Sequence, residues 1–336
     1  MKTTLVVLAL EAIAIAAVLI VALDLREHGR AAPLAGVNEW GYRGPVAHQK
    51  KPNEVRTVVV GGTRAFGWGQ PASALVAEVR RVVMLTTDRP GAPDRPIVVL
   101  NLGRLGADPA SYPDTLAHYA YLHPDYVCLY DDLGVAGGAP TSGTDSTSGV
   151  FLLTGYAPAL PLVAREKGML WQFGDVRSGY VSAAERRGPT GPFVRRTAGT
   201  LLTSIGDVLD AADRGLARLV RNAGDPAAPM RDVSGYAAEM MNAIDAAHRS
   251  AQGVVVVLSP AETARQQANR AALDTRLAAL AGAPWLRIVD LGAERALVSD
   301  PSMRLDSWNY SSSGIARVAN LIAPALLSLI SHAGDL

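Results

Sequence analysis

Cysteine is almost absent from this sequence, because Cys128 is the only one among 336 residues and no internal disulfide can form. Cys128 lies in an apolar run, which favours a buried core thiol over a reactive one. The six histidines are scattered, and no cluster of cysteine and histidine has the spacing of a zinc site. We therefore expect no metal and no other cofactor.

An excess of charge of one sign is also lacking. Lysine and arginine total 32 residues against 31 aspartates and glutamates, for a net charge of +1. Nucleic acid is therefore not an expected partner, because such proteins usually carry a basic surface. The length allows one large α/β domain or two small ones.

One long apolar run stands near the amino end. Leu5 to Leu23 is apolar except for Glu11, and at about 1.5 Å per residue it covers about 28 Å, close to the hydrocarbon thickness of a bilayer. A cleaved signal peptide is the competing interpretation, but Glu11 would interrupt its short apolar region. No cysteine follows that could carry a lipoprotein anchor. We predict a single-pass membrane anchor over residues 4–24.

Glu11 needs a reason to lie in such a span, because an ionisable group there is costly and tends to face protein. One hypothesis is a protonated side chain, or one shallow enough to reach the head groups. The other is a hydrogen bond to a neighbouring span, which would make Glu11 a partner contact in the membrane. The orientation of the span in the membrane is also undecided at this point. Two arginines, Arg26 and Arg30, flank its carboxyl side and only Lys2 flanks its amino side, which by itself favours a cytoplasmic carboxyl side.

Residues 25–53 are rich in glycine, proline and charge and predict a linker and docking segment, and residues 54–336 predict one domain. Within it, buried apolar runs alternate with segments of helical period. The expected strands are 58–60, 96–101, 122–130, 253–260 and 285–291, and the expected helices are 70–84, 200–220, 234–251, 261–281 and one ending at 330. This alternation predicts an α/β fold with a doubly wound, flavodoxin-like parallel sheet. Residues 134–149 predict a loop over the site edge, either flexible or ordered by a partner. Residues 150–162 predict an apolar segment packed on the domain, and residues 177–196 a polar excursion.

The first expected strand ends in Gly61-Gly62-Thr63-Arg64-Ala65-Phe66-Gly67-Trp68-Gly69. The two glycines permit a sharp turn at positive φ. Thr63 then stands at the carboxyl edge of the sheet, where open α/β folds place their sites.

This unit resembles the first block of the SGNH (GDSL-type) hydrolase family, in its membrane-anchored branch. Gly61-Gly62-Thr63 stands for Gly-Asp-Ser, and Phe66-Gly67-Trp68-Gly69 matches the branch's Phe-Gly-x-Gly tail. The segment Asn38 to Pro45 resembles the one that precedes the domain in that branch, and Trp40 and Tyr42 in it are expected to dock on the domain by hydrophobic contact. The resemblance implies a domain outside the cytoplasmic membrane, that is periplasmic, and we follow it for topology.

The resemblance also assigns the remaining catalytic positions. It implies that Gly103, with Gly106 as its companion turn residue, would offer an N–H to the oxyanion. Gly134 falls where the family has an asparagine that donates the second such bond. Asp306 matches the orienting carboxylate, and Asn309 stands in place of the histidine base.

Three roles are therefore lost together, because Thr63, Gly134 and Asn309 replace serine, asparagine and histidine. An amide cannot take a proton near neutral pH, and a hydroxyl without a base is a poor nucleophile. The hypothesis is a non-catalytic accessory or structural subunit that stabilises a membrane protein complex; an energy-converting bacterial assembly, such as a photosynthetic one, is one host among several. The alternatives are a membrane-anchored esterase or O-acyltransferase acting on envelope glycans or lipids, and a glycan-binding module. A cation held by Asp131, Asp132 and Asp306 is a weaker alternative to solvated acids or helix caps.

Overall fold

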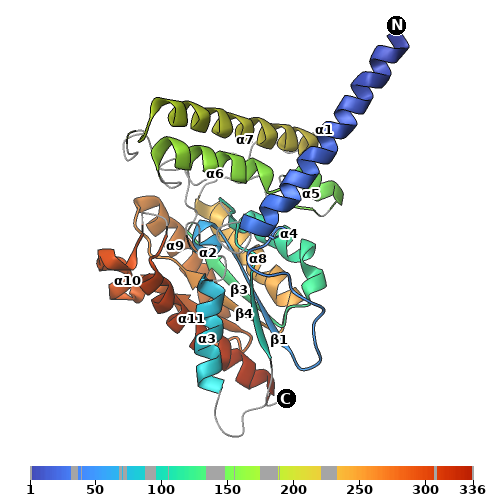
Figure 1. The fold of residues 1–336 in the computed structure, drawn as a ribbon. Coiled ribbons are helices and arrows are strands. Elements are labelled where there is room, and N and C mark those ends of the chain that lie inside the picture. The colour runs from blue at the N-terminus through green and yellow to red at the C-terminus, as the bar shows by residue number, and fades with distance from the viewer. Residues whose placement is uncertain are drawn as a thin grey trace.

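The computed structural model describes residues 2–31, 37–38, 40–67, 70, 74–87, 96–104, 106–133, 148–154, 156–174, 188, 190–220, 233–305 and 309–334. A five-stranded parallel sheet forms the centre, in the order β2-β1-β3-β4-β5 (Figure 1). This is the strand order of flavodoxin-like folds, so the predicted α/β class and doubly wound parallel sheet are confirmed. The strands are β1 (Val55–Gly61), β2 (Ile97–Asn101), β3 (Tyr126–Asp131), β4 (Gly253–Leu258) and β5 (Leu286–Asp290).

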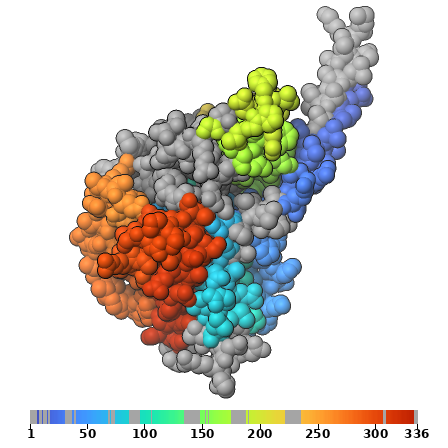
Figure 2. All heavy atoms as spheres, turned by 60° about the vertical axis from the view of Figure 1, so that its left-hand side comes forward, coloured from blue at the N-terminus to red at the C-terminus, as the bar shows by residue number. Residues whose placement is uncertain are grey.

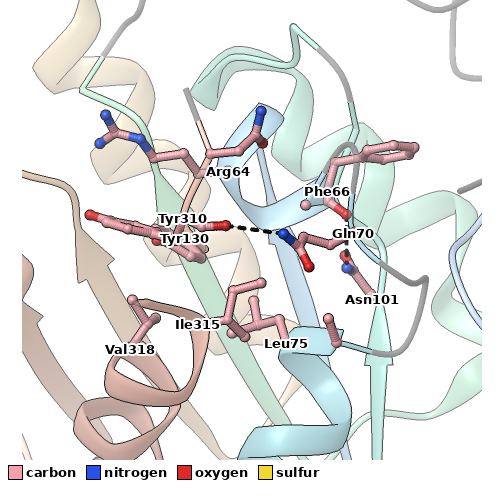
Figure 3. Close-up of a pocket in the computed structure, with 12 residues that line it drawn as sticks. Arg64, Phe66, Gln70, Leu75, Asn101, Tyr130, Tyr310, Ile315 and Val318 are labelled. Carbon is pink, nitrogen blue, oxygen red and sulfur yellow. Dashed lines mark hydrogen bonds between the residues drawn. The ribbon is translucent and has the colours of Figure 1, made fainter. Parts of the chain in front are cut away.

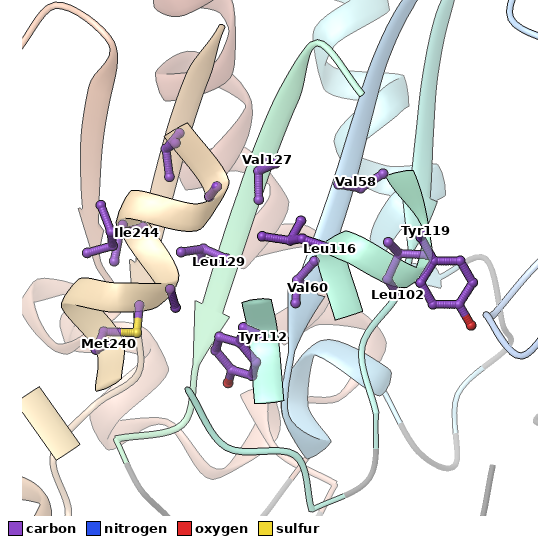
Figure 4. Packing of buried hydrophobic residues seen from close by; sticks show 14 of the residues in the cluster. Val58, Val60, Leu102, Tyr112, Leu116, Tyr119, Val127, Leu129, Met240 and Ile244 are labelled. Atoms are coloured by element: carbon purple, nitrogen blue, oxygen red, sulfur yellow. The ribbon is translucent and has the colours of Figure 1, made fainter. Parts of the chain in front are cut away.

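Side chains of the central strands alternate between two apolar layers, as the period of a strand requires. Val58 and Val60 of β1 face one layer together with Val127 and Leu129 of β3 (Figure 4). This layer is closed by α4 (Tyr112–His118), α8 (Val233–Ser250) and α9 (Ala264–Leu277). Val59 and Cys128 face the opposite layer, which is closed by α3 (Ala74–Thr87) and α11 (Ser312–Gly334). The prediction of a buried Cys128 is confirmed.

A layer of helices lies beyond the sheet domain, on the side of the amino terminus (Figure 1). It consists of α5 (Gly149–Thr154), α6 (Leu160–Phe173) and α7 (Phe193–Val220). The sequence predicted an apolar segment packed on the domain over 150–162, a polar excursion over 177–196 and a helix over 200–220. The helix is confirmed, but the excursion is wrong at its end, because α7 begins at Phe193. Glycines allow α6 and α7 to approach closely: a Cβ on Gly168 would lie 2.3 Å from Thr203 Oγ1, and one on Gly206 would lie 2.7 Å from the Pro161 carbonyl oxygen.

The amino-terminal helix α1 (Lys2–Ala31) extends past the predicted boundary at residue 24, so the linker does not begin there. Buried polar contacts hold its last turns. Asp24 accepts a hydrogen bond from the Leu160 backbone N–H at 2.5 Å and another from the Tyr156 hydroxyl. His28 lies with its ring nitrogens 2.5 Å from the Ala157 carbonyl oxygen and 3.1 Å from that of Val37. The earlier turns stand clear of the body, beside the α6–α7 layer (Figure 1).

Candidate functional site: the turn after the first strand

Thr63 begins the four-residue helix α2 (Thr63–Phe66), directly after β1 at the carboxyl edge of the sheet. The prediction of positive φ at the two preceding glycines is wrong: Gly62 has a φ of −84°, and Gly61 is not among the residues with positive φ. Close packing requires the glycines instead, because a Cβ on Gly61 would lie 2.1 Å from the Tyr130 carbonyl oxygen.

The hydroxyl of Thr63 is buried, with 4% of the residue exposed. Its Oγ1 accepts a hydrogen bond from the Gly106 backbone N–H at 3.1 Å. Gly106, with a φ of 71°, is therefore the glycine of the second block that contacts the threonine side chain. A backbone bond from a turn thus holds this hydroxyl in place.

Gly103 lies against α2, as its assignment to the site requires, but its N–H has another partner. It donates to Asn101 Oδ1 at 2.9 Å, and Asn101 Nδ2 in turn donates to the Ala65 carbonyl oxygen at 2.8 Å. The Asn101 side chain thus closes a short bridge between the end of β2 and α2.

The carboxylate of Asp132, just beyond β3, lies over the start of α2. Its Oδ2 accepts the Arg64 backbone N–H at 3.2 Å, and the Thr63 backbone N–H also bonds to this carboxylate. A Cβ on Gly62 would lie 2.6 Å from the same Oδ2, so only glycine at this position leaves room for it. Burial raises the pKa of Asp132, and the Arg64 charge and the backbone bonds oppose that rise. The resident carboxylate occupies the place at this turn where backbone N–H groups would otherwise meet a bound anion.

The Arg64 side chain neutralises this carboxylate from within the protein. Burial by itself lowers the pKa of Arg64, but attraction to Asp132 and other acidic groups outweighs it and the pKa is raised. The guanidinium also lies 3.4 Å from Glu262 and 5.7 Å from the ring centre of Tyr310. The arrangement is an internally compensated set of charges.

A small cavity lies beside Arg64 (Figure 3). Its volume is about 20 Å³, room for a water molecule rather than for an acyl or sugar group. Gln70 and Tyr310 close one side through a hydrogen bond of 3.3 Å from Gln70 Nε2 to the Tyr310 carbonyl oxygen. Asn309 lines this cavity and is buried, whereas Thr63 is not among its lining residues. The two predicted positions therefore do not both line this cavity.

The six histidines all lie among the described residues, and their hydrogen bonds and ring contacts are with groups other than Thr63. His28 binds backbone carbonyls at the end of α1, and His118 packs against Phe151. His248 stacks on Trp285 with ring centres 3.8 Å apart, and His332 bonds to the Ser328 carbonyl oxygen at 2.6 Å. His48 and His123 are exposed.

Of the other predicted site residues, Gly134 and Asp306 lie outside the described residues. Glu11 lies on α1 and is exposed. Asp131 and Asp132 have different partners: Asp131 accepts bonds from the Tyr236 hydroxyl and, at 2.8 Å, from the Leu133 N–H. Burial raises the pKa of Asp131 to about 7. No group of three metal-binding side chains occurs within the described ranges.

The sequence did not indicate the role of Arg43, which is distant from the turn after β1 in the chain but binds it directly. It comes from the segment expected to dock through Trp40 and Tyr42; Tyr42 is in the core, but Trp40 is half exposed. The Arg43 guanidinium donates to the carbonyls of Phe66, Gly67 and Gln70 at 2.5, 2.7 and 2.8 Å. Burial lowers the pKa of Arg43 to about 10, so it remains charged at neutral pH. Its charge satisfies the carbonyls that α2 leaves open at its end.

Comparison with known proteins does not extend this description. No family model and no curated protein matches the chain. The SGNH resemblance therefore rests on the motifs alone.

Proposed function

We propose that this protein is a non-catalytic, SGNH-like accessory subunit, anchored by α1 in a membrane and stabilising a membrane protein complex there. The proposal is supported chiefly by one observation: the backbone N–H groups at the turn after β1, which could have bound a substrate oxyanion, are already hydrogen-bonded within the protein. Asp132 accepts the N–H groups at the start of α2, and Asn101 accepts that of Gly103. A substrate oxyanion would have to displace a buried carboxylate that Arg64 and two backbone bonds stabilise.

The membrane location is part of the proposal. It is supported by the apolar sequence of α1 and by the exposure of Val18, Leu19 and Leu23 on it. Among the described residues, the helix that is long and apolar enough to cross a bilayer is Ser312–His332 in α11. Ile315, Val318, Ile322 and Leu326 of that helix pack into the core against the sheet, so we assign it to the domain and the anchor to α1. By resemblance, the domain lies on the periplasmic side.

The experiment that tests the proposal is extraction in a mild detergent followed by purification through a tag at the carboxyl end. Stoichiometric recovery of the same membrane proteins is the expected result. Glu11→Leu should weaken that recovery if Glu11 contacts a neighbouring span, with Val18→Leu as a control on the same helix. Turnover of a short-chain aryl ester that disappears in Thr63→Ala would overturn the proposal in favour of an esterase. Binding of an envelope glycan without turnover would instead favour a glycan-binding module.

A further inference from the structure

The helix α7 carries a continuous apolar face that no other described element covers. Its members recur mostly at intervals of three or four residues along the helix, which is about 42 Å long at 1.5 Å per residue. We call this set the outer face: Val194, Ala198, Leu201, Ile205, Val208, Ala212 and Leu219. Four of its large side chains are 62–78% exposed, namely Val194, Leu201, Val208 and Leu219. A soluble helix normally turns such a stripe towards the core.

The charged residues of α7 point the other way. Asp210 is buried and binds Arg165 of α6 at 2.9 Å, and Asp213 is buried and accepts the Val150 N–H of α5 at 2.9 Å. At about 100° per residue, every charged residue of α7 lies more than about 90° from the centre of the outer face. The helix therefore turns Asp210, Asp213 and its buried glycines towards the protein and its aliphatic side chains outwards.

The helix α7 lies on the side of the molecule from which α1 projects (Figures 1 and 2). In Figure 1, α6 lies between α7 and the sheet domain, so the face of α7 opposite α6 is turned towards the amino-terminal end of α1. The bonds of Asp24 and His28 to the segment before α6 fix the base of α1 relative to this layer. A bilayer crossed by α1 would therefore meet α7 next.

The charges at the margins of the outer face suit a phospholipid surface. Arg195 near the start of α7 and Arg218 near its end are exposed at the flanks of the stripe. Arginines in this position can extend to head-group phosphates while the apolar stripe enters the acyl boundary. The one exposed acid of the helix, Asp207, is paired with Arg165 at 2.9 Å.

We propose that the outer face of α7 is a membrane-surface docking helix, which lies in the head-group region of the bilayer that α1 crosses and prefers anionic phospholipid. The proposal depends on the proposed function only for the anchoring by α1. It gives the domain a second attachment and fixes its orientation on the membrane.

The test uses the full-length protein reconstituted in vesicles of phosphatidylcholine and phosphatidylglycerol. Cys128 is buried, so an environment-sensitive fluorophore will report on a single introduced cysteine. The test position is Val208→Cys on α7, and the matched control is Leu85→Cys on α3, because the two side chains are 67% and 66% exposed. The helices α7 and α3 lie at opposite ends of the molecule (Figure 1). We expect lipids carrying a quencher to quench the Val208 label several-fold more than the Leu85 label. That excess should shrink when phosphatidylglycerol is omitted.

A label at Val18→Cys, on α1, separates the two proposals. If Val18 is quenched by lipid and Val208 is not, the anchor stands and the docking helix is overturned. If neither is quenched, the anchor fails as well. Shielding of Val208 only in native membranes would assign the outer face to a protein partner and would likewise overturn the lipid proposal.

Discussion

The Oδ2 atom of Asp132 lies 3.2 Å from the backbone nitrogen of Arg64, although the two residues are 68 positions apart in the chain. The same carboxylate attracts the Arg64 side-chain charge and thereby raises the pKa of Arg64, so one aspartate caps the turn and helps Glu262 to compensate a buried guanidinium. This relationship makes the turn after β1 a closed structural unit.

Asp132→Ala should destabilise the protein strongly. It leaves the backbone N–H groups of Thr63 and Arg64 without this buried acceptor and removes one of the carboxylates that attract the Arg64 charge, the other being Glu262. Each buried donor left without a partner costs about 1–3 kcal/mol. Asp274→Ala is the control, because Asp274 is an exposed partner of Arg270, and the loss of such a pair costs about 0.5 kcal/mol. Urea denaturation followed by circular dichroism will measure both. Equal losses in the two variants would contradict the role given to Asp132.

Restoring the missing side chains should not restore hydrolysis. In the double variant Thr63→Ser/Asn309→His the nucleophile and base types return, but Asp132 and Asn101 still hold the N–H donors. Absence of one oxyanion donor alone costs about 2.7–4 kcal/mol of transition-state stabilisation. We therefore expect aryl-ester turnover equal to that of the parent protein. The matched control is Thr63→Ala/Asn309→His, which has the base but no hydroxyl. A rise in turnover in the first double variant and not in this control would show that the pocket is available to an oxyanion.

Stability should fall as the pH rises from about 4 to about 7, in part through Asp131. Burial raises the pKa of Asp131 to about 7, above that of an unfolded aspartate, so the folded state binds more protons across this range. The stabilisation is complete below the unfolded pKa and is lost as the pH passes the folded one. Asp131→Asn keeps an acceptor for Tyr236 and should flatten this part of the profile.

Unfolding free energies at pH 5 and pH 8 will test the role of Asp131, with Asp274→Asn as the control. Unaltered pH dependence in Asp131→Asn would assign the effect to other groups.

The contact between α6 and α7 should not tolerate a methyl group. In Gly168→Ala the new Cβ would lie 2.3 Å from Thr203 Oγ1 and 2.6 Å from the Gly199 carbonyl oxygen, and such overpacking costs about 1–3 kcal/mol. Gly215→Ala, in α7, meets nothing within 4 Å and should instead stabilise the protein by about 0.5–1 kcal/mol. Thermal melting will compare the two. A stabilised Gly168→Ala would show that the helices can separate without cost.

Local patterns were sufficient to predict the frame of this protein. The valine runs at 58–60 and 254–257 form buried strands because their branched side chains fit a pleated sheet covered on both faces. The helical periods between them predicted α3, α8, α9 and α11, which cover it, but not the short α4. The sequence also shows directly that residue 309 is an amide, which cannot act as a base at neutral pH.

The contacts of the turn after β1 were decided only by the tertiary structure. The glycines at 61 and 62 are needed for close contact with Tyr130 and Asp132 rather than for a special φ, and no local pattern contains those contacts. Arg43 and Asn101 find their partners in α2 only when separate strands and segments meet at one edge of the sheet. The direction of α7 likewise depends on Arg165, which draws the helix's aspartates inwards and leaves its aliphatic side chains outside. Backbone propensity and the spacing of apolar side chains act within one segment, so they can be read from the sequence. A charged side chain can be buried only where the folded chain supplies its hydrogen-bond and ion-pair partners, and these come from distant segments.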